Sequence, residues 1–333
     1  MSSMEPEVST VADDEVVIHV GGEVHRHQGL RPDTSHEFDG VVVRTLPRPG
    51  GELLATIATV NDLHFGETEC GHSSLDMGPI LSMPEGAPPH PEVMNRAAAE
   101  EIDALGPDAL IARGDLTDGG RPEQYEAFRS VYGDRFAARL HVVRGNHEGY
   151  GDPDLMAHPI QHIVVPGAEV VLLDTVVAGE TQGRLESDQL SGMEDIAAAS
   201  SVPVIVMGHH PPHLDDEVVP GLDEDSSSAL ARAMSRHPNI VAYTCGHSHR
   251  NKVTRRPESG GVPYVQVASV KDFPGSWAEI RVFEGGILHI HRRISSPEAL
   301  AWTNRTRELF GGLYPRYSMG RLSDRCLVLG PVP

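Results

Sequence analysis

Cysteine is scarce in this chain of 333 residues, which has three, far apart at Cys70, Cys245 and Cys326. An odd and scattered set without a Cys-X-X-Cys pair excludes a disulfide framework and a thiolate zinc or redox motif. Reduced thiols are typical of the cytoplasm, so we expect a cytoplasmic protein.

Basic residues are also few, with 27 Lys and Arg against 48 Asp and Glu and a formal net charge of -21. Binding to long nucleic acids or anionic membranes depends on Lys and Arg, so this charge argues against both partners. A small substrate is expected instead. The 19 histidines raise the question of a metal centre.

Long apolar runs are missing as well. Residues 1–15 are polar and acidic and lack the basic and apolar regions of a signal peptide. No apolar run approaches the roughly 20 residues needed to cross a bilayer. The sequence therefore predicts no targeting segment and no membrane segment.

The chain divides into four parts by the texture of its sequence. Residues 1–14 are expected to be a disordered acidic tail, and residues 15–50 a β-rich N-terminal appendage too small to fold alone. Residues 51–295 are expected to form the main domain. Residues 296–333 are expected to form a final helix and a tail.

Apolar runs alternate with amphipathic helical stretches in the expected main domain. Six such runs end in charged or polar residues, at 53–62, 108–115, 140–147, 169–175, 202–210 and 240–249. Continuous apolar strands separated by helices are typical of buried, mostly parallel strands. We therefore predict an α/β layered fold, followed by hairpins after residue 250.

Metal-ligating residue types stand where five of these runs end: Asp62 and His64, Asp115 and Asp118, Asn146 and His147, His209 and His210, His247 and His249. In open α/β sheets, ligands bind at the carboxyl ends of strands, so these residues are expected to converge. Carboxylate, imidazole and amide groups suit Mn, Fe or Zn. Seven such groups with one shared carboxylate suit two cations about 3.5–4 Å apart, a spacing that clamps a phosphoryl group.

The order of these motifs resembles the calcineurin-like metallophosphoesterase superfamily over roughly residues 53–292. The matching segments are Asp62-Leu-His64, Gly114-Asp115-Leu-Thr-Asp118, Gly145-Asn146-His147-Glu148, Gly208-His209-His210 and Gly246-His247-Ser-His249. The resemblance implies a four-layer α/β/β/α sandwich with a dinuclear metal centre at the strand ends. It also implies an enzyme, a phosphoric ester hydrolase in which a metal-bound hydroxide attacks phosphorus.

The resemblance further assigns roles to single residues. One metal ion is implied to bind Asp62, His64, Asp115 and His249. The second is implied to bind Asp115, Asn146, His209 and His247, so that Asp115 bridges the pair. His147 is implied to contact phosphate, together with Asn146, and to protonate the leaving group, while Asp118 orients its imidazole. His210 is left as a neighbour of the ligands or a substrate contact.

The substrate class is predicted from short sequence runs that resemble particular branches of the superfamily. The runs HHPPH, GHSHR and GVPYVQVAS look most like the cyclic-nucleotide phosphodiesterase branch, which favours small nucleotide-like or other small diesters. The β-rich start is similar to purple acid phosphatases, but their tyrosine ligand is replaced here by Asp118, which argues against an iron-tyrosinate centre. A phosphomonoesterase and a noncatalytic metal-binding protein of the same fold remain alternatives.

Several weaker expectations concern the surroundings of the site. His72, Arg113 and Arg144 are candidate substrate contacts, although a salt-bridged strand-end role suits the two arginines better. The loop at 65–91 is either a lid or a plain surface insertion. The aromatic and basic C-terminal segment either caps the site or makes a homodimer contact. The pair His289 and His291 is expected on a solvated strand face.

Overall fold

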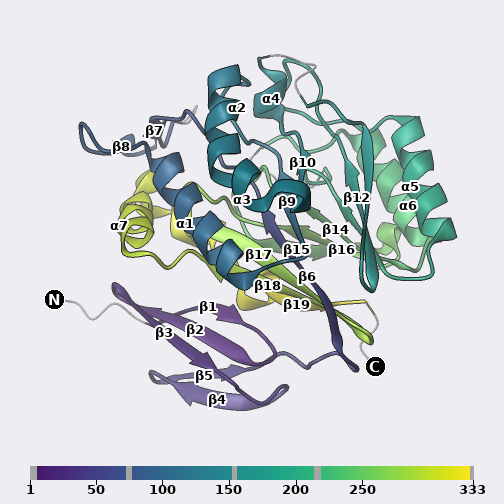
Figure 1. Cartoon of the computed structure of the whole chain (residues 1–333), viewed down its shortest axis with the longest axis horizontal. Helices are drawn as coiled ribbons and strands as arrows, with labels where there is room; N and C mark the ends of the chain where they lie inside the picture. Colours follow the sequence, from purple (N-terminus) through teal and green to yellow (C-terminus); the bar gives the residue numbers. More distant parts are fainter. Residues whose placement is uncertain (1–5, 73–76, 152–155, 214–218, 331–333) are drawn as a thin grey trace.

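Two six-stranded sheets lie face to face at the centre of the protein, in a computed structural model that describes residues 6–72, 77–151, 156–213 and 219–330 (Figure 1). The first sheet has the order β10-β9-β6-β17-β18-β19. Its strands are β6 (Leu53–Val60), β9 (Ala109–Arg113), β10 (Leu140–Val143), β17 (Ser276–Phe283), β18 (Gly286–Arg293) and β19 (Cys326–Leu329).

The second sheet has the order β11-β12-β13-β14-β16-β15. Its strands are β11 (Ile160–Val165), β12 (Ala168–Leu173), β13 (Val204–Met207), β14 (Ile240–Cys245), β15 (Lys252–Arg255) and β16 (Pro263–Gln266). Apolar side chains of both sheets form one shared core, which includes Ile57, Ile111, Val170 and Ile205. The predicted parallel pairing holds for β6 with β9, for β9 with β10, and for β12 through β14 to β16.

Helices cover the outer face of each sheet (Figure 1). The first sheet packs against α1 (His90–Leu105), α2 (Pro122–Phe128) and α7 (Pro297–Thr306), and the second against α5 (Ser187–Ala199) and α6 (Glu224–Arg236). The predicted four-layer α/β/β/α sandwich is therefore confirmed. Among the described residues, no helix is both long and apolar enough to cross a membrane.

Shorter elements complete the chain. They are α3 (Asp134–Phe136), α4 (Asn146–Gly149), α8 (Tyr314–Ser318) and the paired strands β7 (Glu69–Cys70) and β8 (Leu81–Ser82). The last two lie in the 65–91 loop, of which residues 73–76 are outside the described ranges.

The N-terminal part begins earlier than predicted. Strands β1 (Glu7–Val11), β2 (Glu15–Val20) and β3 (Glu23–Gln28) form an antiparallel sheet, and β4 (Ser35–Phe38) pairs with β5 (Val41–Arg44). The expected disordered tail at 1–14 is therefore wrong for residues 7–11, while residues 1–5 lie outside the described ranges. Strand β1 is ordered because it pairs with β2 and buries Val11 against Leu288 and Ile290 of the first sheet.

A second expectation is also wrong. His289 and His291 are buried on the face of β18 that also carries Ile287, which belongs to the core between the two sheets, whereas Leu288 and Ile290 on the other face pack against the N-terminal sheet. The Nδ1 atom of His291 lies 3.0 Å from the carbonyl oxygen of Ser9, and the hydroxyl of Thr10 donates to the carbonyl of His291. Both histidines are structural.

Candidate metal centre

The carboxyl ends of four strands meet at one edge of the sandwich. Asp62 and His64 follow β6, and their backbone is tied to the segment after β9 by hydrogen bonds from the amides of Asp62 to Gly114 and of His64 to Asp115. From the second sheet, the amide of Gly246 donates to the carbonyl of His209, which joins the ends of β13 and β14. Polar side chains from both sheets thus lie together at this edge of the sandwich.

Asp115 lies at the centre of this group. Its Oδ2 is 3.2 Å from Nε2 of His209 and 3.6 Å from Nε2 of His64. Asn146 reaches the same place, with Oδ1 3.2 Å from Nε2 of His209. Ligand atoms of Asp62, His64, Asp115 and His249 all lie within 4.8 Å of one another. Asp115 thus lies close to histidines of both predicted ligand sets, and its role as a bridging carboxylate stays a prediction.

Three buried nitrogen atoms of this group have no hydrogen-bond partner among the described residues: Nδ1 and Nε2 of His64 and Nδ1 of His247. A buried polar atom without a partner costs free energy, and native structures satisfy nearly all of them. Cations between these nitrogens and the carboxylates would satisfy them. The donor set therefore fits a pair of metal ions.

The backbone of the site is strained. Ten non-glycine residues of the described chain have positive φ, and half of them are Asp62, His64, Asp115, His247 and His249, at 48° to 67°. Such conformations cost free energy and cluster at functional sites, where the surrounding structure imposes them. This backbone conformation directs the five side chains toward the site.

Two glycines of the motifs make room for these side chains. A Cβ atom on Gly114 would overlap the ring of His209, and one on Gly145 would overlap the carboxylate of Asp115. Gly114 also has φ of 83°, which L side chains rarely adopt. The Gly-Asp and Gly-Asn pairs are thus steric requirements of the site.

In three of the histidines, one ring nitrogen contacts a backbone carbonyl or a carboxylate of the surrounding protein. Nδ1 of His209 donates to the carbonyl of Arg113 at 2.9 Å, and Nε2 of His247 donates to the carbonyl of Pro220 at 2.8 Å. Nδ1 of His249 lies 3.6 Å from Oδ2 of Asp272. Partners of this kind fix the tautomer of a metal-binding histidine, which leaves the opposite nitrogen free to bind.

The family to which the chain belongs follows from this geometry and from its sequence. Residues 55–251 match the calcineurin-like phosphoesterase family, which is more than half of the chain. The chain belongs to this family. Every residue of the two ligand sets lies inside the matched segment, and the C-terminal segment after residue 251 lies outside it.

The curated relatives that the chain matches are bacterial. A glycerophosphodiester phosphodiesterase of Enterobacter lignolyticus (strain SCF1) is 26% identical over 166 residues, which cover 45% of this chain and 58% of that protein. A probable cyclic nucleotide phosphodiesterase of Synechococcus is 25% identical, covering 60% and 76%. A cAMP/cGMP dual specificity phosphodiesterase of Mycobacterium tuberculosis is 31% identical, covering 44% and 49%. The chain thus matches half to three quarters of these relatives.

Solved structures share the fold of this chain. A dimetal phosphatase from Danio rerio superposes with a TM-score of 0.60 at 16% identity, covering 73% of this chain and 97% of that one. A purple acid phosphatase from yellow lupin superposes with a TM-score of 0.51 at 14% identity, covering 84% and 62%. These likenesses concern the fold.

His147 stands beside the metal ligands, but Asp118 does not hold it as predicted. Nδ1 of His147 donates to the backbone carbonyl of Asp118 at 2.7 Å, whereas the Asp118 carboxylate is 3.9 Å away. That carboxylate lies equally close to His64, at 3.7 Å from Nδ1. The orientation of His147 is therefore set by a carbonyl, because the backbone around Asp118 is tied to Phe65.

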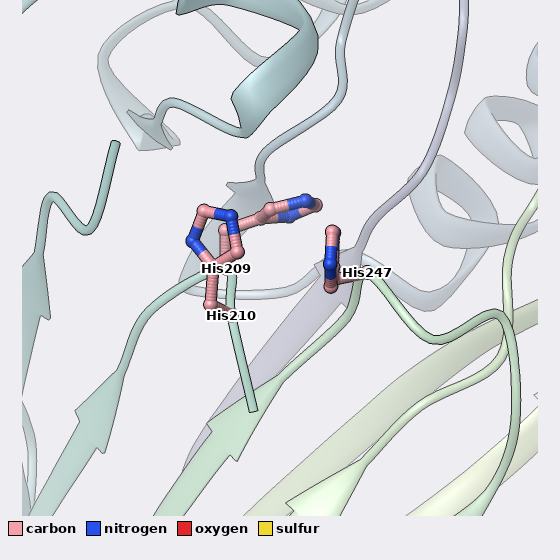
Figure 2. Close-up of side chains that lie close together, drawn as sticks. All are labelled: His209, His210 and His247. Atoms are coloured by element: carbon pink, nitrogen blue, oxygen red, sulfur yellow. The ribbon is translucent and has the colours of Figure 1, made fainter. Parts of the chain in front are cut away.

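Three of the weaker candidate substrate contacts are buried around the site. His210 lies close to His209 and His247 (Figure 2). Its Nδ1 is 2.7 Å from the hydroxyl of Thr175, and its Nε2 is 3.1 Å from the carbonyl oxygen of Thr181. Arg113 is fully buried and donates to Oδ1 of Asn61, and Arg144 forms a buried ion pair with Asp174 at 2.7 Å. The ion pair of Arg144 is the salt-bridged role that suited it better, and a contact of any of the three residues with substrate stays a prediction.

Ionisation differs among the histidines of the site. Burial and the neighbouring His209 lower the pKa of His247 to about 3. Burial would also lower the pKa of His209, but the carboxylate of Asp115 outweighs it and raises that pKa to about 9. Burial and Lys271 hold the pKa of His64 well below its usual value. His64 and His247 are thus neutral at pH 7, as metal ligands must be.

A cavity of about 820 Å³ opens over these residues. His72 lines it, as predicted for a substrate contact, with Nε2 3.1 Å from a carboxylate oxygen of Glu69. The described parts of the 65–91 loop and of the C-terminal segment form its walls. The loop is therefore part of the site rather than a plain surface insertion.

Sequence reasoning missed three polar residues of this cavity: Glu67, Lys271 and Asp272. Lys271 is buried and its Nζ lies 2.7 Å from a carboxylate oxygen of Glu67. Burial would raise the pKa of Asp272, but the neighbouring His249 lowers it to about 2. None of the three belongs to a motif, so only the adjacent Lys271-Asp272 pair after an apolar strand could have drawn attention to them.

Proposed function

We propose that this protein hydrolyses small phosphodiesters with the help of two metal ions. One ion would be held by Asp62, His64, Asp115 and His249, and the other by Asp115, Asn146, His209 and His247. The observation that carries this proposal is the gathering of these side chains around Asp115 and the neighbouring His209, with buried nitrogens of His64 and His247 left unpartnered by the described chain. Mn, Fe or Zn suits this mixture of oxygen and nitrogen ligands.

Two cations at this site supply a water of lowered pKa and positive charge beside the phosphoryl oxygens. The protein itself holds the ligand side chains in position. The amide of His147 donates to Oδ1 of Asp115 at 3.0 Å, which fixes the carboxylate that the two ligand sets share. The amide of His247 likewise donates to Asp62 at 3.0 Å. A diester placed here is held with its phosphorus beside rigid ligands.

His147 is the proposed general acid. Its Nδ1 is occupied by the carbonyl of Asp118, so Nε2 is left to hold a proton for the leaving alkoxide. The ring lines the cavity and is partly exposed, which places it where substrate enters. The proton passes from Nε2 to the alkoxide oxygen as the ester bond breaks, and water restores it.

The charge of the cavity favours diesters over monoesters. Lys271 is the one Lys or Arg in the described lining, and its charge is paired with Glu67. The stretches 73–76, 152–155 and 214–218, which lie outside the described ranges, contain no Lys or Arg in their sequence. A monoester dianion carries an extra negative charge that this lining does not compensate, and the net charge of -21 repels it further.

Hydrolysis of a matched pair of substrates tests the proposal. The purified protein supplied with Mn²⁺ is expected to hydrolyse bis(p-nitrophenyl) phosphate with a higher kcat/KM than p-nitrophenyl phosphate. Asp115→Asn is the matched control, and it should lose nearly all activity because the shared carboxylate is gone. Cleavage of the monoester alone would establish the phosphomonoesterase alternative, and no cleavage of either ester would establish the noncatalytic one.

The cellular setting is also proposed. All three cysteines are free and buried, which supports a reducing compartment and hence the cytoplasm. The acidic net charge supports small substrates rather than long nucleic acids.

A further inference from the structure

Exposed apolar side chains gather around the mouth of the cavity. Eight large hydrophobic residues are exposed in the described chain, and three of them, Met77, Tyr150 and Leu313, line this cavity. Phe310 and Tyr317 line it as well. Exposed apolar side chains concentrated on a concave surface mark a binding site. Tyr150 serves the proposed ligand Asn146, whose Nδ2 donates to its hydroxyl at 2.8 Å, but Met77, Phe310 and Leu313 carry no polar side-chain group, so this apolar part of the patch requires another explanation.

The C-terminal part of this patch, which we call the aromatic wall, consists of Phe310, Leu313 and Tyr317. It is anchored directly to the metal centre. The hydroxyl of Tyr317 donates to the carbonyl of Ser248 at 2.9 Å, and Ser248 stands between the proposed ligands His247 and His249. The aromatic wall is therefore attached to the residue that adjoins both of these ligands.

The backbone of the wall is held in an unusual conformation. Phe310 has φ of 51°, which is rare for a bulky side chain, and Gly311 follows with φ of 65°. The segment is pressed against the 65–91 loop, since a Cβ on Gly78 would lie 2.7 Å from the amide nitrogen of Gly311. Strain of this kind persists where a site imposes it. Here it places the half-buried side chain of Phe310 at the cavity.

We propose that the aromatic wall binds a planar aromatic substituent of the substrate, a nucleobase, while the phosphoryl group lies at the metal ligands. This inference rests on the proposed function and narrows its substrate class. Aromatic side chains stack on every base, and each such contact contributes to binding without reading the base sequence. A small polar substituent such as glycerol would leave the wall uncovered.

The volume and the charge of the cavity suit a ligand with a single phosphoryl group and one base. Its volume of about 820 Å³ lies within the range of pockets that enclose small organic ligands. The one cation of the described lining, Lys271, is paired with Glu67, so no second phosphate is provided for. His72 and Glu69 lie in the same lining and offer polar groups to the edge of a base.

Calorimetric titration of the Mn²⁺-loaded full chain with two product-like phosphates tests the proposal. AMP and ribose 5-phosphate share the phosphate and the sugar, and the nucleobase distinguishes them. Wild type is expected to bind AMP about tenfold or more tightly than ribose 5-phosphate, since base stacking is worth that much. Leu313→Ala and Phe310→Ala should each remove most of this difference and leave the affinity for ribose 5-phosphate unchanged.

Leu53→Ala is the matched control, because Leu53 is 51% exposed and Leu313 58%, but Leu53 lies outside the cavity lining. This variant should keep the preference for AMP. Equal affinity of wild type for the two phosphates, in a protein that hydrolyses bis(p-nitrophenyl) phosphate, would overturn the aromatic wall and leave the proposed function intact. A protein that binds neither phosphate and cleaves no diester would overturn both.

Discussion

The carboxylate of Asp272 joins the C-terminal segment to the metal centre. Its Oδ1 accepts a hydrogen bond from the hydroxyl of Tyr314 at 2.8 Å, and its Oδ2 lies 3.6 Å from Nδ1 of His249. The hydroxyl of Ser269 also donates to this carboxylate. A buried acid held in this way orients His249, so that Nε2 faces Asp62 at 3.7 Å.

Asp272→Asn is expected to weaken Mn²⁺ binding by about 10- to 100-fold, the usual effect of removing a carboxylate behind a metal-binding histidine. Titration calorimetry of the metal-free protein measures it. Asp174→Asn is the matched control, since it removes a buried carboxylate that pairs with Arg144 away from the cavity. Equal Mn²⁺ affinity of Asp272→Asn and wild type would contradict this positioning role.

His147→Gln and Asp118→Asn should differ strongly. Removal of the imidazole is expected to lower kcat for a diester with a poor leaving group by about 10²- to 10⁴-fold, the usual contribution of a general acid. Asp118→Asn keeps the backbone carbonyl that orients Nδ1 of His147, so we expect less than about a tenfold loss. Similar losses in the two variants would show that the carboxylate, and not the carbonyl, orients His147.

Gly145→Ala tests the steric requirement of the site. The added methyl would overlap the carboxylate of Asp115, so the loop must shift and the shared ligand with it. Overpacking of this kind costs about 1–3 kcal/mol of stability, and we expect weaker Mn²⁺ binding as well. Gly50→Ala is the matched control, because a Cβ there has no neighbour within 4 Å. Thermal unfolding and Mn²⁺ titration of both variants provide the comparison, and a Gly145→Ala protein indistinguishable from Gly50→Ala would contradict the crowding at Asp115.

Metal affinity should depend on pH through His209. Burial lowers its pKa, but Asp115 raises it further, to about 9, so in the metal-free protein His209 is protonated at pH 7. A cation must displace this proton, so affinity should rise about tenfold per pH unit from pH 7 and level off above about pH 9. Competition with a chelator at pH 7, 8, 9 and 10 measures it. A constant affinity between pH 7 and 9 would show that His209 is neutral or is not a ligand.

The sequence predicted an α/β layered fold with polar side chains gathered at strand ends, because both leave local signals, whereas the four-layer sandwich was implied by the family resemblance. Apolar runs that end in Asp62 or His209 mark buried strands and their carboxyl ends at once. Left-handed backbone at Asp62 and Asp115 could not be foreseen from residue types that usually avoid it. The geometry of the ligands therefore needed the structure.

The features that sequence reasoning missed depend on tertiary packing. Asp272 and Tyr314 meet across 42 positions of the chain, and neither lies in a motif. The role of Asp118 was assigned to its side chain because residue identity says nothing about a backbone carbonyl. Strand β1 was overlooked because its short, half-polar sequence is stabilised only by β2 and by the sheet beneath it.

Anomalous diffraction from a crystal of the protein grown with Mn²⁺ tests the shared carboxylate most directly. We predict two manganese peaks about 3.5–4 Å apart, with Asp115 between them, His64 and His249 on one side, and His209 and His247 on the other. A single peak, or two peaks without Asp115 as a common ligand, would contradict the dinuclear site.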